Sequence, residues 1–159
     1  MPELGQAHRH LKIEIAMCQY ITITLPKQTR LSELIGIFSK YEMSQRLISN
    51  SSIEAQFAND IIYLNTTSRM CDCDSVIASN AGDSKSENKF SSSIKKMEKK
   101  GWSRSKIERW LNQKENSRRN QELQQDKIRW TNFVSELLNV DQIGKVGLLV
   151  HWYELGLEE

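Results

Sequence analysis

Cysteine is scarce in this chain, with three cysteines among 159 residues. Three is an odd number, and it is too few for the disulfide framework of a small secreted protein. The chain also lacks an apolar run long enough to cross a bilayer, and "MPELGQAHRHLKIEIA" has no continuous apolar block behind a basic start, as a secretory signal would. These absences predict a cytoplasmic protein in a reducing compartment, with no membrane partner.

Several short motifs of common enzymes are also missing. The sequence has no glycine-rich phosphate loop, no paired-histidine metalloprotease motif and no dinucleotide-binding fingerprint. A hydrophobic fraction of 38% with four tryptophans nevertheless indicates a real core, and 159 residues suit one domain. We therefore expect a single domain over residues 1–159 without enzymatic activity.

Apolar periodicity predicts the elements of the first half. Apolar side chains recur at every second position of residues 11–25, which predicts a long strand with one buried face. Pro26 should end this strand. Its buried set would be Leu11, Ile13, Ile15, Met17, Ile21, Ile23 and Leu25. A helix capped by Thr29 follows, and residues 46–49 and 60–67 are expected to be strands. The apolar stripe of that helix is Leu31, Leu34, Ile35 and Phe38.

The second half is expected to be helical until its last strand. Residues 74–93 contain seven serines and predict a flexible loop. A short helix should then end at Gly101, and Ser103 can cap the next helical segment, whose residues 112–122 have no apolar side chain. Residues 145–153, "KVGLLVHWY", have apolar side chains at both odd and even positions, as in a central strand that is covered on both faces. The fold class is therefore α+β: a small mixed sheet of about four strands with helices packed on it, and a helical segment between the third and last strands.

Charge is divided unevenly along the chain. Residues 85–129 hold 14 Lys and Arg against 6 Asp and Glu, a net charge of +8, while the remainder carries −6. This pattern suits a solvated helix, a docking face for a protein partner, or a nucleic-acid-binding surface. The residues predicted to bind a protein partner are Arg104, Arg109, Lys114, Arg118 and Arg119. A helix-turn-helix alternative would place an overlapping set of side chains in the major groove of DNA, namely Arg104, Lys106, Arg109, Asn112 and Gln113.

The stretch "SRMCDCDS" places Cys71 and Cys73 two residues apart. On an extended chain their side chains lie on one side about 6–7 Å apart, too far for a disulfide. A small turn at Asp72 could bring both thiolates onto one zinc ion, with Cys18 and His151 completing four ligands if the first and last strands are neighbours. The alternative, which we favour from the sequence, is that the cysteines are structural and that the protein has no cofactor.

His151 also has a structural and a catalytic interpretation. In the apolar run "LLVHWY" it is most often a hydrogen-bonded core residue. Nucleophilic catalysis would require Cys71 or Cys73 beside it, with Asp72 or Asp74 as the orienting acid. No local feature of the sequence brings these groups together, so no catalytic residue is assigned.

Four blocks carry a resemblance to a known family: "MCQYITITLPK", "SRMCDCDS", "KKGWSRSKIERWL" and "GKVGLLVHWYELG". Together they resemble an uncharacterised family of small bacterial proteins with a Cys-x-Cys block and a C-terminal His-Trp-Tyr strand. The cysteine block of that family usually reads Cys-Asp-Cys-Gly-Thr, whereas Asp74 and Ser75 stand in the last two places here. The resemblance implies no activity. It implies only that four residues belong to recurring blocks, namely Cys18, Cys71, Cys73 and His151.

Together, these features predict a non-enzymatic binding protein. The absence of catalytic motifs, the separated charge and the long polar helical segment favour an immunity (antitoxin) protein that neutralises a bacterial toxin or effector. This is a prediction about the class of protein, because fold alone does not assign function. The alternatives are a zinc- or thiol-dependent protein and a nucleic-acid-binding protein.

Overall fold

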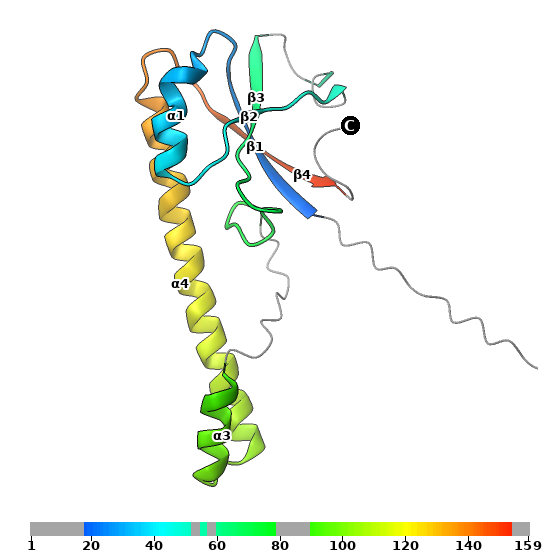
Figure 1. Ribbon diagram of the computed structural model, residues 1–159, viewed down its shortest axis with the longest axis vertical. Coiled ribbons are helices and arrows are strands. Elements are labelled where there is room, and N and C mark those ends of the chain that lie inside the picture. Colours follow the sequence, from blue (N-terminus) through cyan, green and yellow to red (C-terminus); the bar gives the residue numbers. More distant parts are fainter. Residues whose placement is uncertain (1–17, 52–54, 57–59, 79–89, 154–159) are drawn as a thin grey trace, which may run out of the picture.

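Four strands form one sheet in the computed structural model, which describes residues 18–51, 55–56, 60–78 and 90–153 (Figure 1). The strand order is β2-β3-β1-β4, and every neighbouring pair is antiparallel. The strands are β1 (Cys18–Pro26), β2 (Arg46–Leu47), β3 (Ile61–Asn65) and β4 (Gly147–Tyr153). The α+β class and the number of strands are confirmed, but the expected mixed sheet is purely antiparallel.

The alternation predicted for the first strand is confirmed over its described part. Ile21, Ile23 and Leu25 of β1 are at most 1% exposed, and their alternate neighbours lie on the opposite face of the sheet. Gln19, the one polar residue of that parity, is buried with them. The predicted residues 11–17 lie outside the part that the structure describes.

The predicted central position of the last strand is wrong. Within the sheet that the described residues form, β4 is an edge strand that pairs only with β1. Leu148 pairs with Ile23 and Val150 with Ile21, so these side chains share the core face of β1. They remain 37% exposed, and Trp152 is 49% exposed, because the packed layer above β1 does not extend fully over β4. The apolar residues at both odd and even positions of this segment therefore belong to a partly covered edge strand.

Two helices lie side by side against the sheet (Figure 1). They are α1 (Leu31–Lys40) and the C-terminal part of α4 (Arg104–Leu138). Phe38 of α1 meets Phe133 of α4 edge-on at 5.0 Å between ring centroids, and Leu34 and Leu137 are fully buried in the same core. The predicted α1 stripe holds except for Ile35, which is 59% exposed.

The polar run 112–122 does not interrupt the helix. α4 continues through it for 35 residues, roughly 52 Å at the usual rise per residue. Its N-terminal half extends away from the sheet, and α3 (Ser91–Lys99) packs beside its first turns (Figure 1). As expected, Gly101 ends the preceding helical segment, with a φ of 75°. Ser103 occupies the N-cap position of α4, but its side chain makes no capping hydrogen bond. We call residues 90–114, which comprise α3 and the start of α4, the basic hairpin.

Both ends of the predicted loop 74–93 belong to the packed structure. Ser75 and Ala78 are buried, and Val76 and Ile77 pack against the main core. At the other end, residues 91–93 already form the first turn of α3. The intervening residues 79–89 lie outside the described residues. No helix in the described part of the chain is both long enough and apolar enough to cross a membrane.

Candidate functional site

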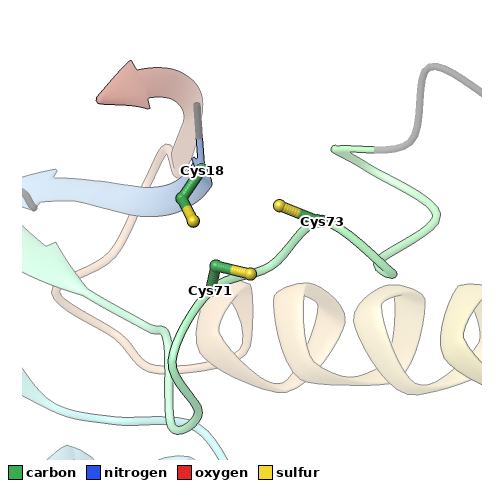
Figure 2. Close-up of side chains that lie close together, drawn as sticks. All are labelled: Cys18, Cys71 and Cys73. Carbon is green, nitrogen blue, oxygen red and sulfur yellow. The ribbon is translucent and has the colours of Figure 1, made fainter. Parts of the chain in front are cut away.

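The three cysteines of the chain converge at one end of β1. The Sγ atoms of Cys18, Cys71 and Cys73 all lie within 4.8 Å of one another. In Figure 2 the three side chains point into a common space between β1 and the segment after β3. All three are free cysteines, with Cys18 and Cys71 partly buried and Cys73 exposed. We call this group the thiol cluster.

Backbone pairing with β1 explains why the segment after β3 arrives there. β3 ends at Asn65, and Thr66 continues the contact by donating its N–H and its hydroxyl to the carbonyl of Ile21, at 3.3 and 2.7 Å. The chain then loops out and returns at Asp72, whose N–H donates to the carbonyl of Gln19 at 2.8 Å. The segment 71–73 thus takes the place beside β1 that a longer β3 would have occupied.

The carboxylate of Asp72 closes this loop. Its Oδ2 accepts the backbone N–H of Ile21 at 2.8 Å and the hydroxyl of Thr67. Burial raises the pKa of Asp72, and the hydrogen bonds from Thr67 and Ile21 act in the opposite direction. The sequence had suggested Asp72 as the site of a small turn between the cysteines and as an orienting acid for catalysis. In the structure its backbone and carboxylate hold the cysteine segment against β1.

Helix α4 holds the segment that follows the cysteines. Asp126 accepts the hydroxyl of Ser75 at 2.9 Å and the backbone N–H of Val76 at 2.7 Å. Trp130 donates its indole N–H to the Ser75 hydroxyl at 3.0 Å, and Arg129 bonds to the other carboxylate oxygen of Asp126. Sequence analysis missed this contact because Asp126 lies about fifty residues further along the chain than Ser75.

Backbone and neighbouring groups set the electrostatics of the thiol cluster. The backbone N–H of Gln19 donates to the sulfur of Cys73 at 3.3 Å. Partial desolvation of its sulfur raises the pKa of Cys73, the Gln19 N–H opposes that rise, the nearby Cys71 adds to it, and the nearby Cys18 opposes it. Burial also raises the pKa of Tyr20, and the adjacent Cys18 and Cys71 raise it further. The sulfur of Cys71 thus disfavours negative charge on both Cys73 and Tyr20, and a bound cation would offset that effect.

His151 is not part of this group, so the predicted four-ligand set is wrong for that residue. Of the four predicted ligands, only the three cysteines lie close enough together, among the described residues, to share one metal ion. Tyr20 is the cross-strand partner of His151, while Cys18 pairs with Tyr153, so the register offsets His151 from Cys18 by two residues. That offset is about 6.8 Å along a strand. His151 Nε2 instead shares a hydrogen bond of 2.8 Å with Thr22 Oγ1, and burial lowers the pKa of its imidazole.

The five residues predicted to bind a partner all lie on α4, but they do not share a face. At about 100° per residue, Arg104 and Arg109 are turned about 140° apart around the helix. Arg104 pairs with Glu108 at 3.2 Å, and Arg118 pairs with Glu115 and Glu122. Lys114 is exposed and Arg119 is half-buried.

The sequence analysis did not assign a second group of basic residues as a candidate binding surface. Lys95, Lys96, Lys99 and Lys100 are all exposed, and they fall within about 140° of the surface of α3. Together with α4, they give the basic hairpin eight Lys and Arg side chains against two Glu side chains. The signal was present in "KKMEKK", but the sequence did not show that this segment would pack beside the start of α4.

Comparison with protein-family models, with curated proteins and with solved structures gave no match to this chain. The resemblance of the four sequence blocks to an uncharacterised bacterial family therefore stays a prediction.

Proposed function

We propose that this chain is a non-enzymatic, cytoplasmic binding protein of the immunity (antitoxin) class, which holds an acidic surface of a bacterial toxin or effector on its basic hairpin. The observation that carries the proposal is the position of the hairpin. It projects from the sheet along α4 and carries eight exposed basic side chains against two Glu. Such a concentration of one charge sign accelerates association with an oppositely charged partner and selects against others.

Apolar contacts keep the hairpin in shape. Phe90 and Trp110 meet edge-on at 5.8 Å between ring centroids, and Ile107 of α4 is 6% exposed. The backbone N–H of Trp102 donates to the carbonyl of Met97 across the turn at 3.1 Å. A preformed surface loses little conformational entropy on binding, which favours a stable complex.

The aromatic rings favour a protein partner over a nucleic acid. Lys106 covers the ring of Trp102, with its Nζ 4.2 Å from the ring centroid, and the ring of Trp110 packs against Phe90. A single-strand binder would instead offer such rings to stack on bases. The exposed Glu108, one turn from Arg104, would also repel phosphate on the surface that a major-groove helix presents.

The test uses the product of the gene directly upstream of the gene for this chain. Under the proposal, that product arrests growth, co-expression of this chain restores growth, and the two proteins form a complex. Lys96→Glu with Lys100→Glu should slow association about tenfold at low salt. The matched control, Lys127→Glu with Lys145→Glu, reverses the same number of exposed lysines outside the hairpin and should change association little.

Two results would contradict binding of a toxin at the basic hairpin: an upstream product that does not inhibit growth, or equal association rates for the two double variants. A third result would favour the nucleic-acid alternative. This is binding of the chain to a 20-base-pair DNA duplex at 150 mM salt with an affinity tighter than the micromolar range typical of non-specific contacts.

A further inference from the structure

We propose that Cys18, Cys71 and Cys73 bind one Zn²⁺ ion through three thiolates, and that the fourth coordination position is open to solvent beside Cys73. This site goes beyond the partner-binding function and rests on different residues. It also differs from the four-ligand arrangement that the sequence suggested, because His151 is not a ligand.

The distances suit a tetrahedral zinc ion. A Zn–S bond of about 2.3 Å in tetrahedral geometry places two sulfurs about 3.8 Å apart. The three sulfurs already lie within 4.8 Å of one another. Side-chain adjustments of about 1 Å, without a change of backbone, would therefore complete the three bonds. Thiolates are soft ligands that favour Zn²⁺ over Mg²⁺ and Ca²⁺.

The backbone holds the ligands in place before any metal arrives. Cys18 is the first residue of β1, and the hydrogen bond between Asp72 and Gln19 fixes the other two cysteines to the next residue of the same strand. The Asp72 carboxylate adds a second attachment, to Ile21. A site organised in this way loses little entropy when it binds an ion, which raises its affinity.

The surroundings of Cys73 suit a metal thiolate. The backbone N–H of Gln19 donates to its sulfur at 3.3 Å, and such bonds from outside the ligand set orient ligands and stabilise their charge. A mere set of inert core cysteines would be buried, yet Cys73 is exposed and the other two are only partly buried. Solvent therefore reaches the cluster on the Cys73 side.

The fourth position follows from the count of ligands among the described residues and from the exposure of Cys73 to solvent. No His, Asp or Glu of the described residues joins the three cysteines in the group that could hold a metal. Structural zinc sites close with four protein ligands, while a site with three keeps a position for water or an incoming ligand. We therefore place an exchangeable ligand on the solvent side of the ion.

Zinc content and affinity test the site directly. The tag-free full-length chain, purified under reducing conditions, should bind one equivalent of added Zn²⁺ in competition with a chromophoric chelator. Cys18→Ser, Cys71→Ser and Cys73→Ser should each weaken zinc binding at least tenfold, while the control His151→Gln should retain it. Wild-type affinity in Cys71→Ser, or fewer than about 0.1 equivalents bound to the reduced wild type, would overturn the proposal.

Cobalt provides a readout that does not depend on the folding of the variants. Co²⁺ added to the wild type should give sulfur-to-cobalt charge-transfer absorption and the intense visible bands of tetrahedral coordination. Added imidazole should shift those visible bands, because it enters the open position. Weak, octahedral-type bands would contradict a three-thiolate site, and bands unmoved by imidazole would contradict the open position.

Discussion

Ser75 and Asp126 are joined by a hydrogen bond of 2.9 Å between the Ser75 hydroxyl and the Asp126 carboxylate. This bond ties the segment after the thiol cluster to the middle of α4. The same carboxylate oxygen accepts the N–H of Val76, and the Ser75 hydroxyl accepts the indole N–H of Trp130. One carboxylate therefore links the cysteine-bearing segment to the helix that also carries the basic hairpin.

Replacing this carboxylate should destabilise the fold. In Asp126→Ala the N–H of Val76 and the hydroxyl of Ser75 lose their shared acceptor, and leaving such partly buried groups unpaired costs about 1–3 kcal/mol. Urea denaturation followed by circular dichroism measures the loss. The control Glu122→Ala, one turn earlier on α4, removes an exposed ion pair with Arg118 and should change stability by less than about 1 kcal/mol. Equal effects of the two substitutions would show that Asp126 does not hold the segment.

Two glycines should respond to alanine in opposite directions. Gly101 has a φ of 75°, a left-handed conformation in which a Cβ is strained, so Gly101→Ala should destabilise the protein by about 1–2 kcal/mol. Gly36 lies within α1, and a Cβ built there meets nothing within 4 Å. Gly36→Ala should therefore stabilise by about 0.5–1 kcal/mol. The midpoints of thermal unfolding of both variants give the comparison, and a stabilising Gly101→Ala would contradict the left-handed turn.

His151 should make stability fall as the solution becomes mildly acidic. Burial lowers the pKa of its imidazole in the folded protein below the usual 6.5, so the unfolded chain takes up a proton at higher pH than the folded chain does. Stability is therefore fully present above the unfolded pKa and is lost as the pH falls from 6.5 towards the lower folded pKa. Chemical denaturation at several pH values between about 7.5 and 5 measures this slope.

The control for that experiment is His151→Gln, which keeps a polar group near Thr22 without a titrating imidazole. The slope between pH 7.5 and 5 should flatten in this variant. An unchanged slope would assign the pH dependence to other groups.

Local features of the fold were predictable from the sequence because neighbouring residues decide them. The alternation around Ile21 and Ile23 identifies the buried face of β1, since successive side chains of a strand point to opposite faces. Gly101 marks the end of a helical segment through its own backbone preference, because glycine readily adopts a positive φ. Strand periodicity also predicted that Cys71 and Cys73 share one side of the chain, but their sulfurs lie within 4.8 Å of one another, closer than the extended chain would place them.

Tertiary structure alone decided which distant groups meet. Cys73 contacts the backbone of Gln19, 54 residues earlier, because the segment after β3 returns to β1 through Asp72. The register between β1 and β4 places His151 opposite Tyr20 and so separates it from Cys18, which no periodicity could reveal. Hydropathy likewise reported that β4 is apolar but not that it lies at an edge, because the apolar content of a strand does not determine which neighbours cover it.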